Sequence, residues 1–154
     1  MFRNLVNYCW SKDTTGLRGE LLNTSMKINH LLAPHQTDSH IKDLKNEVSR
    51  FIKWAKPMLD INTKMKIKLV PIKKTQNNQY SFGSFNPNTN EIIIAYKDRH
   101  ILDCLRTLAH EMVHLKQNIN NELTDTSGET GSPEECEANS IAGILMRKWN
   151  KIYN

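Results

Sequence analysis

The feature that most constrains this chain is the pentapeptide His110-Glu111-Met112-Val113-His114, which lies in a stretch with the hydrophobic spacing of a helix. Residues four apart lie one above the other on the same face of a helix. His110 and His114 can therefore bind one metal ion together, each through a ring nitrogen about 2.0–2.1 Å away. Glu111 points away from this pair and can reach a metal-bound water without being a ligand, as a general base must.

The apolar residues around the motif predict the helix and place both histidines on its polar side. They form one stripe at helical spacing: Ile101, Leu102, Leu105, Leu108, Ala109, Met112 and Val113. Successive residues turn by about 100°, so His110 and His114 are expected on the accessible side, lining a cleft. A chance match to H-E-x-x-H occurs about once in a hundred such sequences, and an ordinary solvated helix face is then the alternative. We interpret the motif as that of a zinc-dependent hydrolase, most often a peptidase.

Catalytic zinc normally has three protein ligands and one open position, so a third ligand is expected further along the chain. A second amphipathic helix is predicted to begin at Ser132, which can cap it, with Pro133 in its first position and acidic residues near its positive end. Its apolar face consists of Ala138, Ile141, Ala142, Leu145 and Trp149. One of the early carboxylates of this helix could complete the site.

Helical geometry does not decide which carboxylate that is. By angle, Glu134 lies nearest the middle of the apolar face, with Glu135 and Glu137 on its two flanks. A buried carboxylate without a partner is costly, so an acid that points inward needs a cation. For Glu135, an interaction with the helix dipole is the simpler interpretation. Cys136 is a soft ligand by chemistry, although an inert buried thiol is the simpler interpretation.

Two segments of the chain resemble small gluzincin-type zinc metallopeptidases, and most closely the ImmA/IrrE group and related short phage-encoded peptidases. They are L-A-H-E-M-V-H-L-K-Q (Leu108–Gln117) and E-C-E-A-N-S-I-A-G-I-L-M (Glu135–Met146). In that group the second motif reads approximately E-x-E-A-N-x-F-A-x-x-L-L-M, and the Glu directly before Ala-Asn is a zinc ligand. The resemblance therefore implies one Zn²⁺ per chain, bound by His110, His114 and Glu137, with Glu111 as the general base.

The remaining sequence predicts one α+β domain over 1–154, with a helical N-terminal part (1–60) and a catalytic core (61–154). Helices are expected over 17–33 and from Asp38 or Ser39 to Pro57. The expected architecture is a minimal zincin-like domain. A small three-stranded, mostly antiparallel sheet packs against the metal-binding helix, and a C-terminal helix carries the third ligand.

The strands of that sheet are predicted from alternation and turn formers. Met65, Ile67 and Leu69 alternate with lysines, as in a strand with one exposed face. The segments 79–85 and 91–96 flank Asn86-Pro87-Asn88-Thr89-Asn90, which predicts a β-hairpin.

The expected partner is a protein or peptide substrate. An exposed strand of the hairpin could pair with an extended substrate and place its scissile carbonyl near the metal. Glu111 would take the proton of the attacking water and deliver it to the leaving amine. Tyr80, Tyr96 and His100 are candidate oxyanion donors by position, but each is more simply structural.

Charge suggests a different class of function. The net charge is +5, and lysines concentrate at Lys64, Lys66, Lys68, Lys73 and Lys74, where they could contact phosphates. The alternative is thus a nucleic-acid-associated protease, as SprT-type enzymes are, or a basic nucleic-acid-binding protein. No nucleic-acid-binding motif supports it, and no histidine follows His114 to supply the third histidine ligand of SprT-type enzymes. A lysine-blunted, solvated strand is the simpler interpretation.

A further alternative is a protein that binds the metal without turnover, although Glu111 would then have no use as a base. Three widely spaced cysteines, no signal peptide at the start and no membrane-spanning apolar run predict a cytoplasmic protein, in the host cytoplasm if it is phage-encoded.

Overall fold

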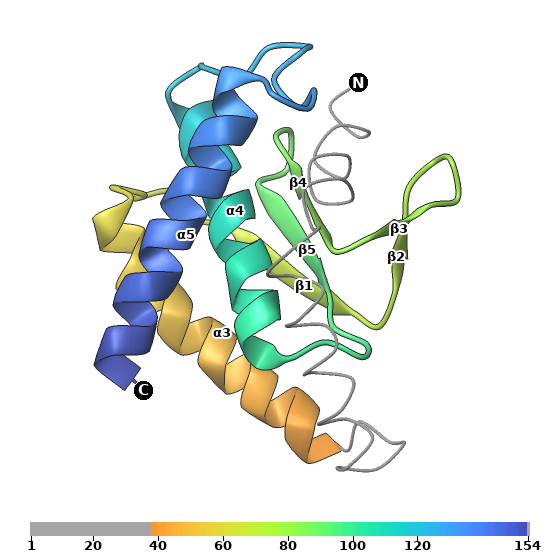
Figure 1. The fold of residues 1–154 in the computed structure, drawn as a ribbon, viewed down its shortest axis with the longest axis vertical. Coiled ribbons are helices and arrows are strands. Elements are labelled where there is room, and N and C mark those ends of the chain that lie inside the picture. Colours follow the sequence, from red (N-terminus) through yellow and green to blue (C-terminus); the bar gives the residue numbers. More distant parts are fainter. Residues whose placement is uncertain (1–37, 154) are drawn as a thin grey trace.

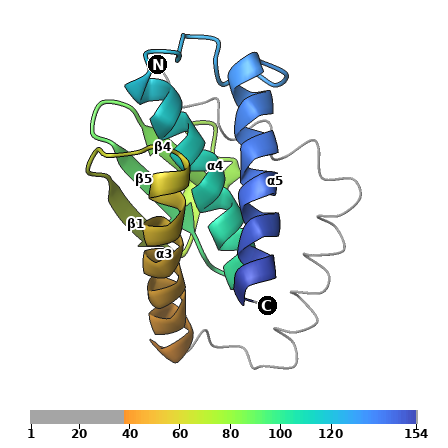
Figure 2. The same cartoon turned by 90° about the vertical axis from the view of Figure 1, so that its left-hand side faces the viewer.

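The computed structural model describes residues 38–153 and has an α+β fold, as expected. In chain order its elements are α3 (Asp38–Met58), β1 (Lys66–Val70), β2 (Lys73–Lys74), β3 (Tyr80–Ser81), β4 (Gly83–Asn86), β5 (Glu91–Ala95), α4 (Ile101–Ile119) and α5 (Pro133–Tyr153). Figures 1 and 2 show α4 in the middle, with the sheet on one side and α3 and α5 on the other. The helix expected over 17–33 lies outside the described residues.

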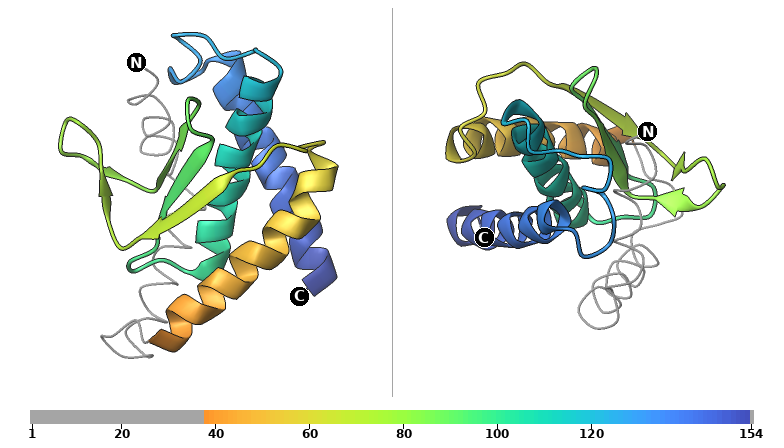
Figure 3. Two further views of the ribbon diagram at one scale, coloured as in Figure 1. Left: turned by 180° about the vertical axis from the view of Figure 1, so that it is seen from behind. Right: turned by 90° about the horizontal axis from the view of Figure 1, so that it is seen from above.

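The predicted three-stranded sheet is confirmed, with one of its two pairs parallel, but the segment predicted as one strand over 79–85 is divided between β3 and β4. The larger sheet has the order β1-β5-β4, and a separate ribbon pairs β2 with β3. The predicted hairpin joins β4 to β5 in antiparallel register, Phe85 opposite Ile92, whereas β1 runs parallel to β5, Ile67 opposite Ile92. The connection from β1 to β5 passes through β2, β3 and β4, so it is long enough for a parallel crossover. Figure 3 shows the β2–β3 pair extending outward beyond the larger sheet.

The hydrophobic core forms where these elements meet around α4. On β5, Ile92 and Ile94 are fully buried, as alternation on one sheet face requires. Phe51 of α3 meets Trp149 of α5 edge to face, with ring centroids 5.1 Å apart. Each such fully buried apolar side chain contributes about 1.5–3 kcal/mol. The core thereby fixes α4 and α5 side by side.

The expectation that α4 has an accessible polar side is wrong. From Cys104 to Gln117 every residue of this helix is buried except Arg106 and Lys116. His110 is 0% exposed and His114 3% exposed. The physical reason is that α4 contacts α3, α5, β4 and β5, so its polar side is covered as well.

The predicted start of α5 is confirmed. Pro133 is its first residue, and the hydroxyl of Ser132 accepts a hydrogen bond of 3.2 Å from the backbone N–H of Glu135. Capping of this kind satisfies one of the free N–H groups of the first turn. Among residues 38–153, no helix combines the length and the apolar character that crossing a membrane requires.

We expect Ser132→Ala to lower the free energy of unfolding by about 1 kcal/mol, because the capping hydrogen bond is lost. Denaturant unfolding would measure the change, and Ser140→Ala, at an exposed position within α5, is the matched control. Equal stability of the two variants would show that the cap is unimportant.

Candidate metal centre

Three buried side chains from two helices converge in the described part of the chain. His110 and His114 come from α4 and Glu135 comes from the first turn of α5, and their candidate ligand atoms all lie within 4.8 Å of one another. The two Nε2 atoms are 3.0 Å apart. The Glu135 carboxylate faces both rings, with Oε1 3.1 Å from Nε2 of His114 and Oε2 3.4 Å from Nε2 of His110.

These separations match a tetrahedral metal site. Ligand atoms about 2.0–2.1 Å from a zinc ion at tetrahedral angles lie about 3.3 Å from one another. The three observed separations, 3.0, 3.1 and 3.4 Å, fall close to this value. Within the described residues, neither oxygen of Glu135 has a hydrogen-bond donor other than the imidazoles that it faces. The donor set therefore fits a divalent cation such as zinc.

The predicted third ligand, Glu137, is not part of this cluster, and Glu135 occupies its place. Glu137 is exposed, and its Oε2 accepts a hydrogen bond of 2.8 Å from the side-chain amide of Gln117. Glu134, the choice by helical angle, is half-buried and does not belong to the cluster either. Glu135 is 0% exposed, so its expected role as a dipole partner alone is also corrected.

The resemblance pointed to Glu137, whereas the helical angle pointed to Glu134 because of the assumed centre of the apolar face of α5. Ile141 was counted as part of this face but is only partly buried, whereas Met146 on the other flank is buried. The centre therefore shifts toward Glu135. The buried positions 135, 138, 142, 145 and 149 follow a three–four spacing, so extending the apolar pattern back by one step would have identified Glu135.

Gln117 is a buried residue that links the two helices at the cluster. Its Oε1 lies 2.8 Å from Nδ1 of His114, an arrangement in which the ring nitrogen donates. Its Nε2 donates to the backbone carbonyl of Glu134 at 2.9 Å and to Glu137 at 2.8 Å. With a metal ion in the site, Nδ1 of His114 would keep its proton on Gln117 and Nε2 would present its lone pair to the ion. The only signal for this role in the sequence is weak: Gln117 lies on the polar side of the predicted helix.

The other histidine has an amide neighbour as well. Asn139, one turn after Glu135 on α5, is a side-chain hydrogen-bond partner of His110. Each imidazole thus has its own amide contact, and partners of this kind orient metal-binding histidines.

Electrostatics within the cluster favour an ionised Glu135. Burial raises its pKa, but hydrogen bonds with His110 and His114 outweigh burial, and the net pKa is lowered. For His114, burial lowers the pKa, and the hydrogen bond with Glu135 and the charge of Glu111 turn the net shift upward. For His110 burial dominates, and the pKa is lowered. A carboxylate facing one neutral imidazole is a suitable metal-binding set.

Glu111 lies between α4 and the sheet, close enough to His114 and Glu135 for their charges to act on it. It is 1% exposed, and a Cβ placed on Gly83 of β4 would lie 3.3 Å from its Oε1. Within the described residues its Oε2 has no hydrogen-bond partner. Burial raises the pKa of Glu111 to about 8, against the opposing charges of His114 and Lys73. A nearby divalent cation would favour the ionised form that a base needs.

The remaining candidate residues lie apart from the cluster. His100 caps α4, where its Nδ1 accepts a hydrogen bond of 3.1 Å from the backbone N–H of Leu102. Tyr80 is 72% exposed and stacks with Lys74. Cys136 is exposed rather than buried, and it is not among the residues of the cluster. Tyr96 is half-buried just after β5.

The predicted lysine-rich strand has one exposed row of charges. Lys66 and Lys68 are exposed on β1, which lies at one edge of the sheet. Lys73, on β2, is half-buried instead and acts electrostatically on Glu111.

No family model, curated protein or solved structure matches this chain.

We expect Glu135→Ala to abolish tight zinc binding, because it removes one of three ligands, whereas Glu137→Ala retains the metal. Elemental analysis of both purified variants after dialysis would measure bound zinc. The opposite result, with zinc lost only from Glu137→Ala, would restore Glu137 as the ligand.

We expect Gln117→Ala to weaken zinc affinity about 10- to 100-fold, since His114 loses the group that orients it. Competition with a chromogenic chelator would measure the affinity. Asn118→Ala is the matched control, because this side chain bonds to Pro87 rather than to the cluster. Equal zinc affinities in the two variants would show that Gln117 does not orient His114.

Proposed function

We propose that this protein is a zinc-dependent metallopeptidase with a minimal zincin-like domain, in which His110, His114 and Glu135 hold the metal. The observation that carries the proposal is a buried carboxylate facing two imidazoles at tetrahedral separations, with a second buried carboxylate, Glu111, one residue after the first histidine. A structural metal site would not need this second acid. A catalytic site would use it as a base.

The roles of the side chains follow from their positions. A zinc ion in the site would supply a Lewis acid that acidifies water and polarises a carbonyl group. Glu111 is not one of the three converging residues, so its carboxylate is available to accept the proton of the attacking water and pass it to the leaving amine. Gln117 and Asn139 hold the imidazoles in orientation.

The sheet offers a way to hold an extended substrate. In the described sheet β4 is an edge strand, and its Gly83 lies against Glu111. A peptide that adds to this edge as a further strand would pass beside the base. A protein substrate taken as an extended segment is therefore the substrate class that we propose.

One observation favours a second candidate, a metal-binding protein without turnover. All three residues of the cluster are buried, as is usual for structural metal sites. The two candidates agree on the metal and differ only in whether Glu111 acts on a substrate.

We expect Glu111→Gln to keep the fold and the bound zinc but to lose peptide hydrolysis by at least 100-fold, because the amide cannot accept a proton at neutral pH. Digestion of a complex peptide mixture, followed by mass spectrometry, would measure activity without knowledge of the substrate. Wild-type activity should disappear on chelation and return with zinc.

Zinc content and the circular dichroism spectrum of the Glu111→Gln protein are the controls. Undiminished cleavage by this variant would contradict the proposed mechanism. Zinc binding by the wild-type protein with no cleavage of any peptide would favour the second candidate.

A further inference from the structure

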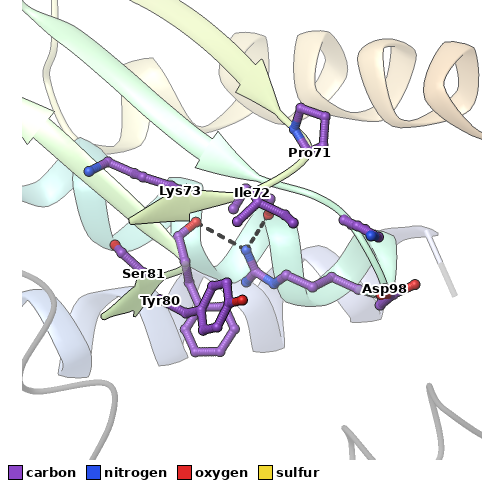
Figure 4. Close-up of a pocket in the computed structure, with 10 residues that line it drawn as sticks. Pro71, Ile72, Lys73, Tyr80, Ser81 and Asp98 are labelled. Carbon is purple, nitrogen blue, oxygen red and sulfur yellow. Dashed lines mark hydrogen bonds between the residues drawn. The ribbon is translucent and has the colours of Figure 1, made fainter. Parts of the chain in front are cut away.

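A hollow of about 320 Å³ lies beside the β2–β3 ribbon, at the end of β5. Its apolar lining includes Pro71, Ile72, Phe82 and Ala95, and its lining also includes Lys73, whose charge acts on the proposed catalytic base. Figure 4 shows Pro71 and Ile72 on one side of this hollow and Tyr80 on the other. The hollow is open enough to receive a side chain from outside.

Two consecutive residues, Phe82 and Gly83, connect the hollow to the proposed base, Glu111. Phe82 lines the hollow, and the next residue, Gly83, contacts Glu111. Thr107, one turn before Glu111 on α4, would also meet a Cβ on Gly83, at 2.5 Å from its Cγ2. A substrate lying along β4 past Glu111 would therefore bring a neighbouring residue to the hollow.

Arg99 forms a fixed wall of the hollow rather than a charge offered to a ligand. Its guanidinium donates to the carbonyls of Ala95 at 2.6 Å and Phe82 at 3.1 Å, contacts that Figure 4 shows as dashed lines. It also donates to Asp103 at 2.7 Å and to Thr107 at 2.6 Å. With these partners Arg99 is neutralised and its geometry is fixed.

Lys73 also lines the hollow, but within the described residues it is not paired in the way that Arg99 is. It is half-buried, and the structure gives its ammonium no hydrogen bond or ion pair with any of the described residues. Burial lowers the pKa of this ammonium, and the charge of Glu111 opposes the shift. Partial burial of a cation costs free energy unless an anion accompanies it. An anion that enters the hollow would therefore be attracted to Lys73.

We propose that the hollow is the subsite for an acidic residue of the substrate, Glu or Asp, near the scissile bond, with Lys73 as the residue that binds its carboxylate. This inference rests on the proposed peptidase function. The apolar lining suits the methylene groups of a Glu side chain, and Lys73 matches its charged end. Lys97 and Asp98 also line the hollow with opposite charges, so that among the described residues Lys73 supplies the unpaired positive charge of its lining.

The test is a mass-spectrometric cleavage profile on a proteome-derived peptide mixture. The wild-type enzyme should show Glu and Asp enriched at one position within two residues of the cleaved bond. Lys73→Met should lose this enrichment and cleave matched Glu and Gln peptides at rates within about twofold. Lys73→Arg should restore part of the preference, because it retains the charge.

Lys66→Met is the matched control, since it removes the same charge from an exposed strand position outside the hollow. It should keep the wild-type preference. A wild-type profile without acidic enrichment, or an enrichment that Lys73→Met leaves intact, would overturn the subsite while leaving the peptidase function standing.

If the wild-type protein cleaves nothing, the proposed function fails, and the subsite is then tested by binding. NMR titration of the Glu111→Gln protein with acetyl-Leu-Glu-Ala-amide should shift the amide signals of Phe82 and Ala95 more than the Gln peptide does. The difference should vanish in the double variant with Lys73→Met, and equal shifts from the two peptides would reject the subsite.

Discussion

The packing of α5 against α4 is the interaction on which the candidate site depends. It places the carboxylate of Glu135 against two imidazoles in a region with essentially no solvent exposure. A buried carboxylate costs several kcal/mol unless cations or donors compensate it. The cap at Ser132 and the bonds from Gln117 to the start of α5 hold the helix so that this carboxylate faces inward. Packing and metal binding therefore use the same contacts.

On the side of α4 that faces away from α5, the sheet packs against Glu111. Gly83 is the point of closest approach between β4 and the helix, where any side chain would meet Thr107. The absence of a side chain at this position lets the edge strand lie directly against Glu111. Arg99 reinforces this side, because it ties the carbonyls of Phe82 and Ala95 to the first turns of α4. Glu111 is thus enclosed between α4 and β4, which these contacts hold together.

The sequence predicted the elements well and the contacts between helices less well. Local signals sufficed for the β4–β5 hairpin, the strand at Ile67 and the cap at Ser132, since each depends on neighbouring residues. Burial of His110 depends on where α5 and the sheet pack, which periodicity on α4 does not report. The preference for Glu137 followed the family resemblance, and the angular preference for Glu134 assumed that Ile141 is buried, whereas this residue is only partly buried. The contacts of Gln117 with Glu134 and Glu137 and the electrostatic interaction of Lys73 with Glu111 join residues distant in the sequence, so local patterns could not predict them.

Because Glu111 is buried, its ionisation would depend on whether a metal ion is bound. Without a metal, burial raises the pKa of Glu111 to about 8, so its carboxyl is mostly protonated at neutral pH. In that state it cannot accept a proton. A dication bound by the neighbouring residues would lower this pKa, because it favours the charged form over a short distance. The low-polarity surroundings that make Glu111 an unfavourable carboxylate in the metal-free protein would then strengthen its attraction to the dication, so that binding of a metal ion would also favour ionisation of Glu111.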